Sequence, residues 1–147
     1  MIVVIGESIK TGLIAEIKKA FPGAVVYKEQ IRTEPIFPHF FIELLTLDIS
    51  EERQGFYWLN SFITIRYREG ADIQLVNNLH LKLDDVAFRM LTDMTRISFS
   101  GVLANITGAR TEKVEGDLHY FCNIRIQLTR QWIAHIKQMT LEQRRIG

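Results

Sequence analysis

The sequence is poor in cysteine and proline and carries no excess charge of one sign. Among 147 residues there is one cysteine, Cys122, which excludes an intrachain disulfide and a cysteine-rich zinc site. With 18 basic and 17 acidic side chains the formal net charge is +1. Broad, sequence-independent binding to nucleic acid needs a basic surface, so this balance argues against it. The three prolines form no linker, and one compact unit is expected.

Long hydrophobic runs are also missing. The apolar stretch at residues 2–5 has no basic residue before it and ends at Gly6, so we expect neither a signal peptide nor a membrane span. A cytoplasmic setting is the default expectation. The same start lacks a phosphate-binding loop, because five residues separate Gly6 from Gly12 and Leu13 follows where that loop needs a lysine.

Hydrophobic periodicity predicts the elements of the first half of the chain. Apolar residues at three- to four-residue spacing predict an amphipathic helix over 5–20, which a Pro-Gly pair ends. A short strand is expected over 24–31. Alternation over 39–49 and 56–69 predicts a long hairpin across a polar loop at 48–55.

A second helix and one or two further strands follow. Asp72 is a suitable N-cap for a long helix whose apolar stripe runs over 73–94. The segment 97–114 is expected to form one or two strands, with Gly101 and Gly108 as bulge or bend sites.

The cleanest alternation in the chain lies at 118–130, where every second residue is apolar. Segregated helices and hairpin-connected strands indicate an α+β fold, with a mainly antiparallel β-sheet packed against two α-helices. The predicted domain covers residues 1–130. Residues 131–147 form a C-terminal extension that is either a docking helix or a loose tail, with Trp132, Ile136 and Met139 on one helical face.

Candidate metal ligands do not converge. His39 and Glu43 share a strand face, but four residues along a strand span about 13 Å, which is too far to share one ion. His80 and Asp84 lie one helical turn apart, and no third ligand is evident. We therefore expect neither a metal site nor a cofactor.

Candidate nucleophiles do not converge either. Cys122 alternates in phase with core residues, and His119 falls on the opposite strand face, so no Cys-His dyad forms within the strand. An enzyme is disfavoured. The remaining enzyme hypothesis is a small-molecule site assembled from distant residues around His119, Glu29 and Arg125, which predicts a closed pocket. A nucleic-acid module would need a basic patch.

Several large aromatic side chains lie on the strand face opposite the expected core, so the core does not account for them. They form either a second core under a helix or a subunit interface, since aromatic anchors are enriched in interfaces. The predicted interface residues are Phe56, Trp58, Phe62, Phe121 and Trp132.

Several motifs resemble those of a known family. The chain contains "IKKAFPGAVVYKEQI", then "EPIFPHFFIELL", "FITIRYRE" and finally "KVEGDLHYFCNIRIQL". Together they resemble the tail terminator proteins of long-tailed phages and prophages of Gram-positive bacteria, over about residues 9–129. The matching positions are Phe21, Pro22, Tyr27, Glu29, Pro38, Phe40, Phe41, Ile42, Gly116, Leu118 and His119. The three-residue "FPH" before Phe40 and the tail from Gln131 depart from the family pattern.

The resemblance implies a structural assembly protein without enzyme activity or cofactor. Such a protein forms a ring with copies of itself, a hexamer in this family, on the end of the tail tube. It stops polymerisation of the tube protein and joins the tube to the head connector or neck protein. DNA passes through without specific binding. The expected location is the virion tail or neck, and the host cytoplasm during assembly. The nearest rival is another neck or head-tail joining protein.

Overall fold

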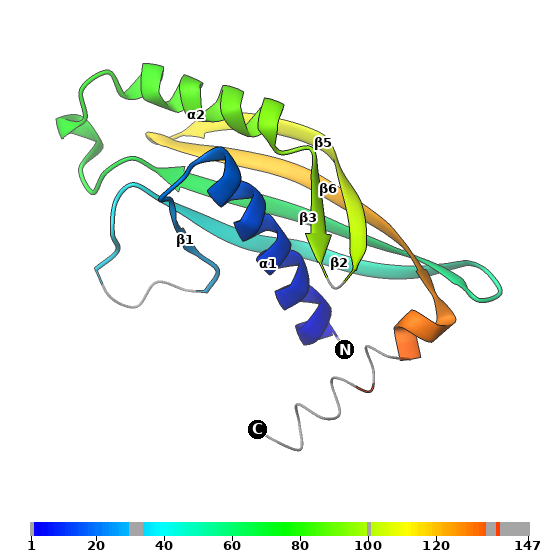
Figure 1. Cartoon of the computed structure of the whole chain (residues 1–147). Coiled ribbons are helices and arrows are strands. Elements are labelled where there is room, and N and C mark those ends of the chain that lie inside the picture. Colours follow the sequence, from blue (N-terminus) through cyan, green and yellow to red (C-terminus); the bar gives the residue numbers. More distant parts are fainter. Residues whose placement is uncertain (1, 30–33, 100, 135–137, 139–147) are drawn as a thin grey trace.

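The chain folds into a six-stranded sheet that curls around two main helices (Figure 1). A computed structural model describes residues 2–29, 34–99, 101–134 and 138. The elements are α1 (Ile2–Ala20), β1 (Val25–Tyr27), β2 (His39–Arg53), β3 (Phe56–Arg68), the 3₁₀ turn η1 (Ile73–Leu75), α2 (Leu79–Asp93), β4 (Arg96–Phe99), β5 (Val102–Val114) and β6 (Asp117–Thr129). The predicted α+β fold is confirmed.

The strand order in the sheet is β1-β2-β3-β6-β5-β4. The short strand β1 pairs with β2 in parallel, and each of the other neighbouring pairs is antiparallel, as the sequence predicts. The two long hairpins, β2-β3 and β5-β6, meet where β3 pairs with β6. This central pairing runs from Phe56↔Thr129 to Tyr67↔Leu118.

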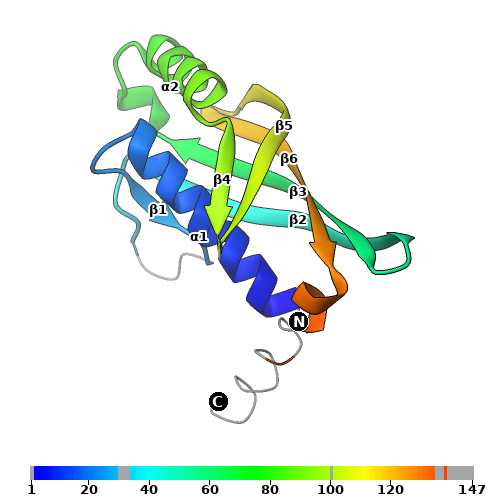
Figure 2. The same cartoon turned by 45° about the vertical axis from the view of Figure 1, so that its right-hand side comes forward.

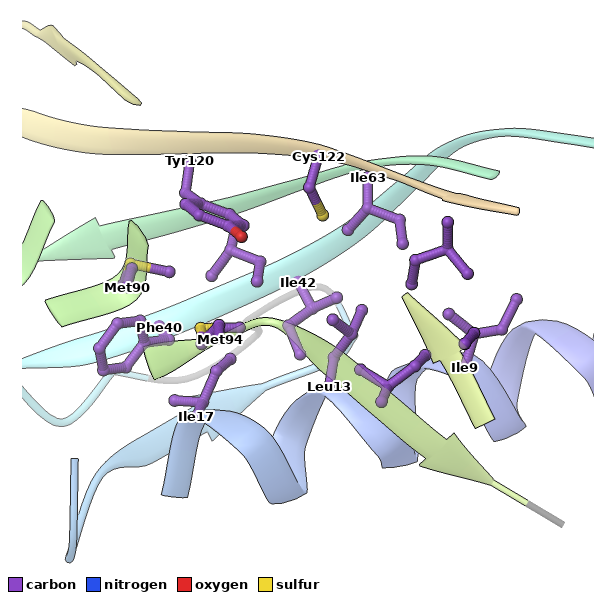
Figure 3. Close-up of a cluster of buried hydrophobic side chains, with 14 of the residues drawn as sticks. Ile9, Leu13, Ile17, Phe40, Ile42, Ile63, Met90, Met94, Tyr120 and Cys122 are labelled. Atoms are coloured by element: carbon purple, nitrogen blue, oxygen red, sulfur yellow. The ribbon is translucent and has the colours of Figure 1, made fainter. Parts of the chain in front are cut away.

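One hydrophobic core joins both helices to a single face of the sheet. Helix α1 contributes Ile9, Leu13 and Ile17, which are fully buried because their spacing places them on one helical stripe (Figure 3). The facing strands contribute the residues that alternation predicts, such as Ile63 and Cys122. Burying each large aliphatic side chain contributes about 1.5–3 kcal/mol, so this layer supplies most of the driving force for folding.

Two glycines fix how the elements meet. A Cβ added at Gly12 in α1 would lie 3.1 Å from the carbonyl oxygen of Ser98, so the missing side chain lets α1 approach β4 closely. Gly108 has a φ of +62° and sits where the β5-β6 register shifts between Thr107 and Arg110. The expected bulge at Gly108 is therefore confirmed.

The second helix begins later than the sequence pattern predicts. Asp72 accepts a hydrogen bond from the backbone N–H of Gln74, at 3.0 Å, and so caps the short turn η1 rather than the long helix. Helix α2 starts at Leu79, after Asn78 in the left-handed conformation. The predicted start was wrong because a side-chain cap stabilises a single turn as readily as a long helix.

The predicted loop at 48–55 was also wrong. Strand β2 continues through its polar residues to Arg53, and the turn consists of Gln54 and Gly55, the latter with a φ of +86°. The strand persists because its residues pair with β3, for example Asp48 with Asn60, apart from an irregularity at Glu52 between Glu51 and Arg53. Backbone pairing, unlike burial, does not require apolar side chains.

Other boundaries differ less. Strand β1 is shorter than the expected 24–31, and the last two residues of that range lie outside the described part. Residues 130–134 are helical, and Trp132 packs partly buried against the core. Ile136 and Met139 lie outside the described residues, and the predicted domain boundary at residue 130 stays a prediction.

Candidate functional site

The outer face of the sheet, opposite the helices, carries a layer of aromatic and arginine side chains. Trp58 and Phe62 on β3 and Phe121 on β6 point to this side, and each is partly buried. Among the described residues both helices lie on the other side (Figures 1 and 2). We call Trp58, Phe62 and Phe121, with Arg110 and Arg125, the aromatic layer.

Strand register brings the members of this layer into contact. Phe121 pairs with Thr64 and is a diagonal neighbour of Phe62, and their rings stack with centroids 6.0 Å apart and an interplanar angle of 12°. The guanidinium of Arg110 lies 4.4 Å from the Phe121 ring centroid, and that of Arg125 lies 4.0 Å from Trp58. These cation–π contacts cover aromatic surface that a second layer of helices would otherwise cover.

The layer extends toward the β2-β3 turn. The Trp58 indole N–H donates a hydrogen bond to the Glu52 carboxylate. Phe56, at the start of β3, is 38% exposed, and the Arg53 guanidinium lies 5.2 Å from its ring. The structure therefore gathers four of the five predicted interface residues on β3 and β6, whereas Trp132 packs against the core from the helical segment 130–134.

The opposite end of the outer face is covered rather than open. His39 is buried there, its Nδ1 lies 3.0 Å from the Ile36 carbonyl oxygen, and its ring contacts Tyr27 and Phe37. Arg68 donates to both carboxylate oxygens of the buried Asp117, from Nε at 3.0 Å and from Nη2 at 2.9 Å. Burial lowers the pKa of His39.

A shallow groove of about 360 Å³ lies between α1 and β2. Gly6, Glu7 and Lys10 line it from the helix, and residues 43–47 line it from the strand. Lys28 bridges to its rim, where the ammonium lies 3.1 Å from the Glu7 carboxylate. None of the residues proposed for a remote enzyme site, His119, Glu29 and Arg125, lines this groove.

Reactive side chains remain apart in the described part of the chain. Cys122 is buried in the core, and burial raises the pKa of its thiol to about 12, so at neutral pH it is a packing residue (Figure 3). His119 lies on the outer face against the Phe121 ring. His80 and Asp84 are both exposed on α2. Within residues 2–29, 34–99 and 101–134, no cluster of three histidine, cysteine or acidic side chains is placed to hold a metal ion.

One apolar surface was missed by the sequence pattern. Leu81 and Phe88 point away from the core on α2 and are each 68% exposed, with Leu91 beside them. The predicted stripe accounts for Leu83 and Met90, which are buried. A seven-residue interval between Leu81 and Phe88 places them on one helical face, and this spacing was the available signal.

Comparison with known proteins gives one clear match. A family model described as "Phage tail terminator protein" matches residues 8–133, which is most of the chain. No curated protein sequence matches. No described helix has the length and apolar character needed to cross a membrane.

Proposed function

This chain belongs to the phage tail terminator family, and on that premise we propose that it closes the end of the tail tube as a ring of identical subunits. Family membership makes it a structural, non-enzymatic protein of the virion tail with a role in terminating the tail tube. Our proposal adds the ring, a hexamer as the resemblance implies, and the joint to the head connector. It also adds the host group, long-tailed phages and prophages of Gram-positive bacteria, which the quoted motifs support.

The observation that carries the proposal is the aromatic layer. Aromatic residues and arginine are the side chains most enriched in protein interfaces and in their energetic hot spots. Here arginines contact Trp58 and Phe121, and Phe62 stacks on Phe121, on a face without a covering helix in the described residues. A face of this kind offers apolar area to a protein partner.

A ring is the assembly that suits one type of subunit at a tube end. Repeated head-to-tail contacts generate a closed ring when the rotation between copies closes, and closure leaves no free contact to propagate. The near-neutral chain agrees with a channel through which DNA passes without being held, because a strongly basic lumen would bind phosphates.

The joint to the head is the second part of the proposal. A ring has two faces, and when one is bound to the tube the other remains available to a connector or neck protein. We place the protein at the tail-neck boundary in the virion and in the host cytoplasm during assembly. Another neck or head-tail joining role is the alternative, and it predicts binding to connector rings without capping of tubes.

Tube capping tests the function directly. Tail tube subunits are polymerised with and without the purified protein, and the tubes are measured by electron microscopy. We expect tubes that stop growing and carry a density at one end. The double variant Phe62→Ala and Phe121→Ala should lose capping because it removes the stacked pair.

A matched control comes from α2. Phe88→Ala removes an aromatic ring that is 68% exposed but lies outside the aromatic layer, and it should cap tubes normally. Tubes that lengthen unchecked beside the unaltered protein would reject the terminating role in this system. If the variant with Phe62→Ala and Phe121→Ala still caps tubes and Phe88→Ala does not, the surface that contacts the tube lies on α2 rather than on the aromatic layer.

A further inference from the structure

One end of the sheet has two open edges on opposite sides. There β2, β3 and β6 run side by side as residues 48–53, 56–60 and 125–129, which we call the arm. Strand β1 pairs only with the first three residues of β2, His39 to Phe41. On the other side the β5-β6 pairing begins at Ile106↔Ile124, so no described strand pairs with the outer edge of residues 125–129.

Open strand edges are unusual at this length. Each presents unpaired backbone N–H and C=O groups and acts as a template for another strand, so folded proteins normally shorten or cover it. In the arm neither edge is covered by a described strand, although β3 between them is paired along both sides. The arm therefore offers two strand-addition sites that face away from each other.

The two edges carry opposite charges. The β2 edge holds Asp48, Glu51 and Glu52 against a single cation, Arg53. The β6 edge holds Arg125, and Arg130 follows directly after the strand. Within the described residues Asp48, Glu51 and Arg130 form no ion pair, and Arg125 contacts the Trp58 ring. The β2 edge of one copy is thus complementary in charge to the β6 edge of a second copy.

We infer that the open edge of β2 in one copy pairs with the open edge of β6 in the next copy, so that the sheet continues from subunit to subunit. The inference rests on the ring proposed above and names the strands that build it. A contact between two different edges of the same chain is head-to-tail, which is the type of contact that closes a ring. Opposite charges fix which edges meet, because two β2 edges would repel each other.

Single cysteines on the two edges test the pairing. Ser50 and Gln127 are exposed, uncharged and on the same outer face. Both lie opposite Trp58, so within one copy they are separated by two strand spacings. Ser50→Cys and Gln127→Cys are purified separately, mixed with each other and with tail tube subunits, and treated with a short bis-maleimide. Because each chain carries one engineered thiol, a link between them joins two copies.

We expect covalent dimers in the mixture and none with either variant alone. The unaltered protein controls for Cys122, which is buried. Thr92→Cys, exposed on α2, mixed with Gln127→Cys controls for chance collision and should give no dimer. Dimers from Ser50→Cys alone would overturn the inference, since they require a β2 edge to meet another β2 edge.

Charge reversal gives a second, independent readout. Asp48→Lys with Glu51→Lys should weaken self-association by about tenfold or more, measured by light scattering across a concentration series, and adding Arg125→Glu to the same chain should restore part of it. Reversing the charge of Arg96 on β4 instead should not restore self-association.

The edge pairing and the terminating function can fail separately. Capped tubes without Ser50–Gln127 links would reject the edge pairing and leave the terminating function intact. Tubes left uncapped by the unaltered protein would reject the function itself.

Discussion

Strands β3 and β6 carry large side chains on both of their faces, but the two faces stabilise these side chains differently. On the inner face Ile63 and Cys122 are fully buried beneath the helices (Figure 3). On the outer face Phe62 and Phe121, their neighbours in sequence, are only partly buried and stack on each other. Alternation along a strand thus places adjacent residues in the core and on the outer surface.

The difference bears on our proposal that the outer face contacts a protein partner. A core side chain is enclosed by many neighbours, and removing it leaves a cavity. In the aromatic layer Arg110 lies over Phe121 and Arg125 lies over Trp58, while Phe62 stacks on Phe121, so these rings are supported by single contacts rather than enclosed. We therefore expect inner-face substitutions to reduce stability and outer-face substitutions to reduce assembly.

Ile63→Ala should give the largest effect. Deleting a fully buried aliphatic side chain costs about 2–5 kcal/mol, because the transfer energy is lost and a cavity remains. Phe62→Ala, one position earlier on the same strand, should cost about 1 kcal/mol or less, mainly its stacking with Phe121. Guanidinium chloride unfolding of both variants measures the two values. Equal losses would contradict the distinction between the two faces.

Sequence patterns located most of this architecture because burial leaves a periodic signal. The alternation over 118–130 identified the inner face of β6, from Leu118 to Leu128, all of which is buried. The same pattern placed Trp58, Phe62 and Phe121 on the opposite face. The alternation could not predict that Arg110 and Arg125 lie over Phe121 and Trp58, because cation–π contacts depend on which strands become neighbours.

Two features of β2 and its neighbours could not be predicted because they leave no periodic signal. The polar end of β2 carries no alternation of apolar residues, and it is a strand because β3 pairs with it. The open edges of the arm could not be predicted from the sequence for a related reason. An edge is open or paired according to how far β1 and β5 extend alongside β2 and β6. Tertiary pairing, unlike burial, leaves little trace in one sequence.

Breaking the pair between Arg68 and Asp117 should give the next largest effect. This pair lies on the outer face, but it resembles the core because the Asp117 side chain is 8% exposed while that of Arg68 is 42% exposed. Arg68→Ala leaves a buried carboxylate without its partner and should cost about 2 kcal/mol, whereas Asp117→Ala leaves an arginine that water can reach and should cost about 1 kcal/mol. Urea unfolding at neutral pH compares them. The reverse order would contradict the assigned burial.

His39 should make stability depend on pH at the covered end of the outer face. Desolvation lowers its pKa in the folded state below the usual 6.5, and the nearby Arg68 and Arg66 act in the same direction, while the Ile36 carbonyl and Asp117 oppose them. The unfolded state therefore binds more protons, so this contribution to stability is complete above pH 6.5 and is lost as pH falls through the folded pKa. Urea midpoints at pH 5 and 7.5 should differ less in His39→Asn than in the unaltered protein. His119→Asn is the matched histidine control, and an identical change in both variants would remove His39 from the explanation.

The smallest effect should come from the contact between Arg125 and Trp58. A cation–π contact at a partly exposed site contributes about 0.5–1 kcal/mol, so a double-mutant cycle with Arg125→Gln and Trp58→Leu should give a coupling free energy in that range. Either variant alone should leave the fold intact, because the core beneath it is unchanged. The same variants should nevertheless reduce tube capping, since both residues belong to the aromatic layer and Arg125 also lies on the β6 edge. A coupling of several kcal/mol, with capping unaffected, would mean that the outer face is a second core rather than a surface held ready for a partner.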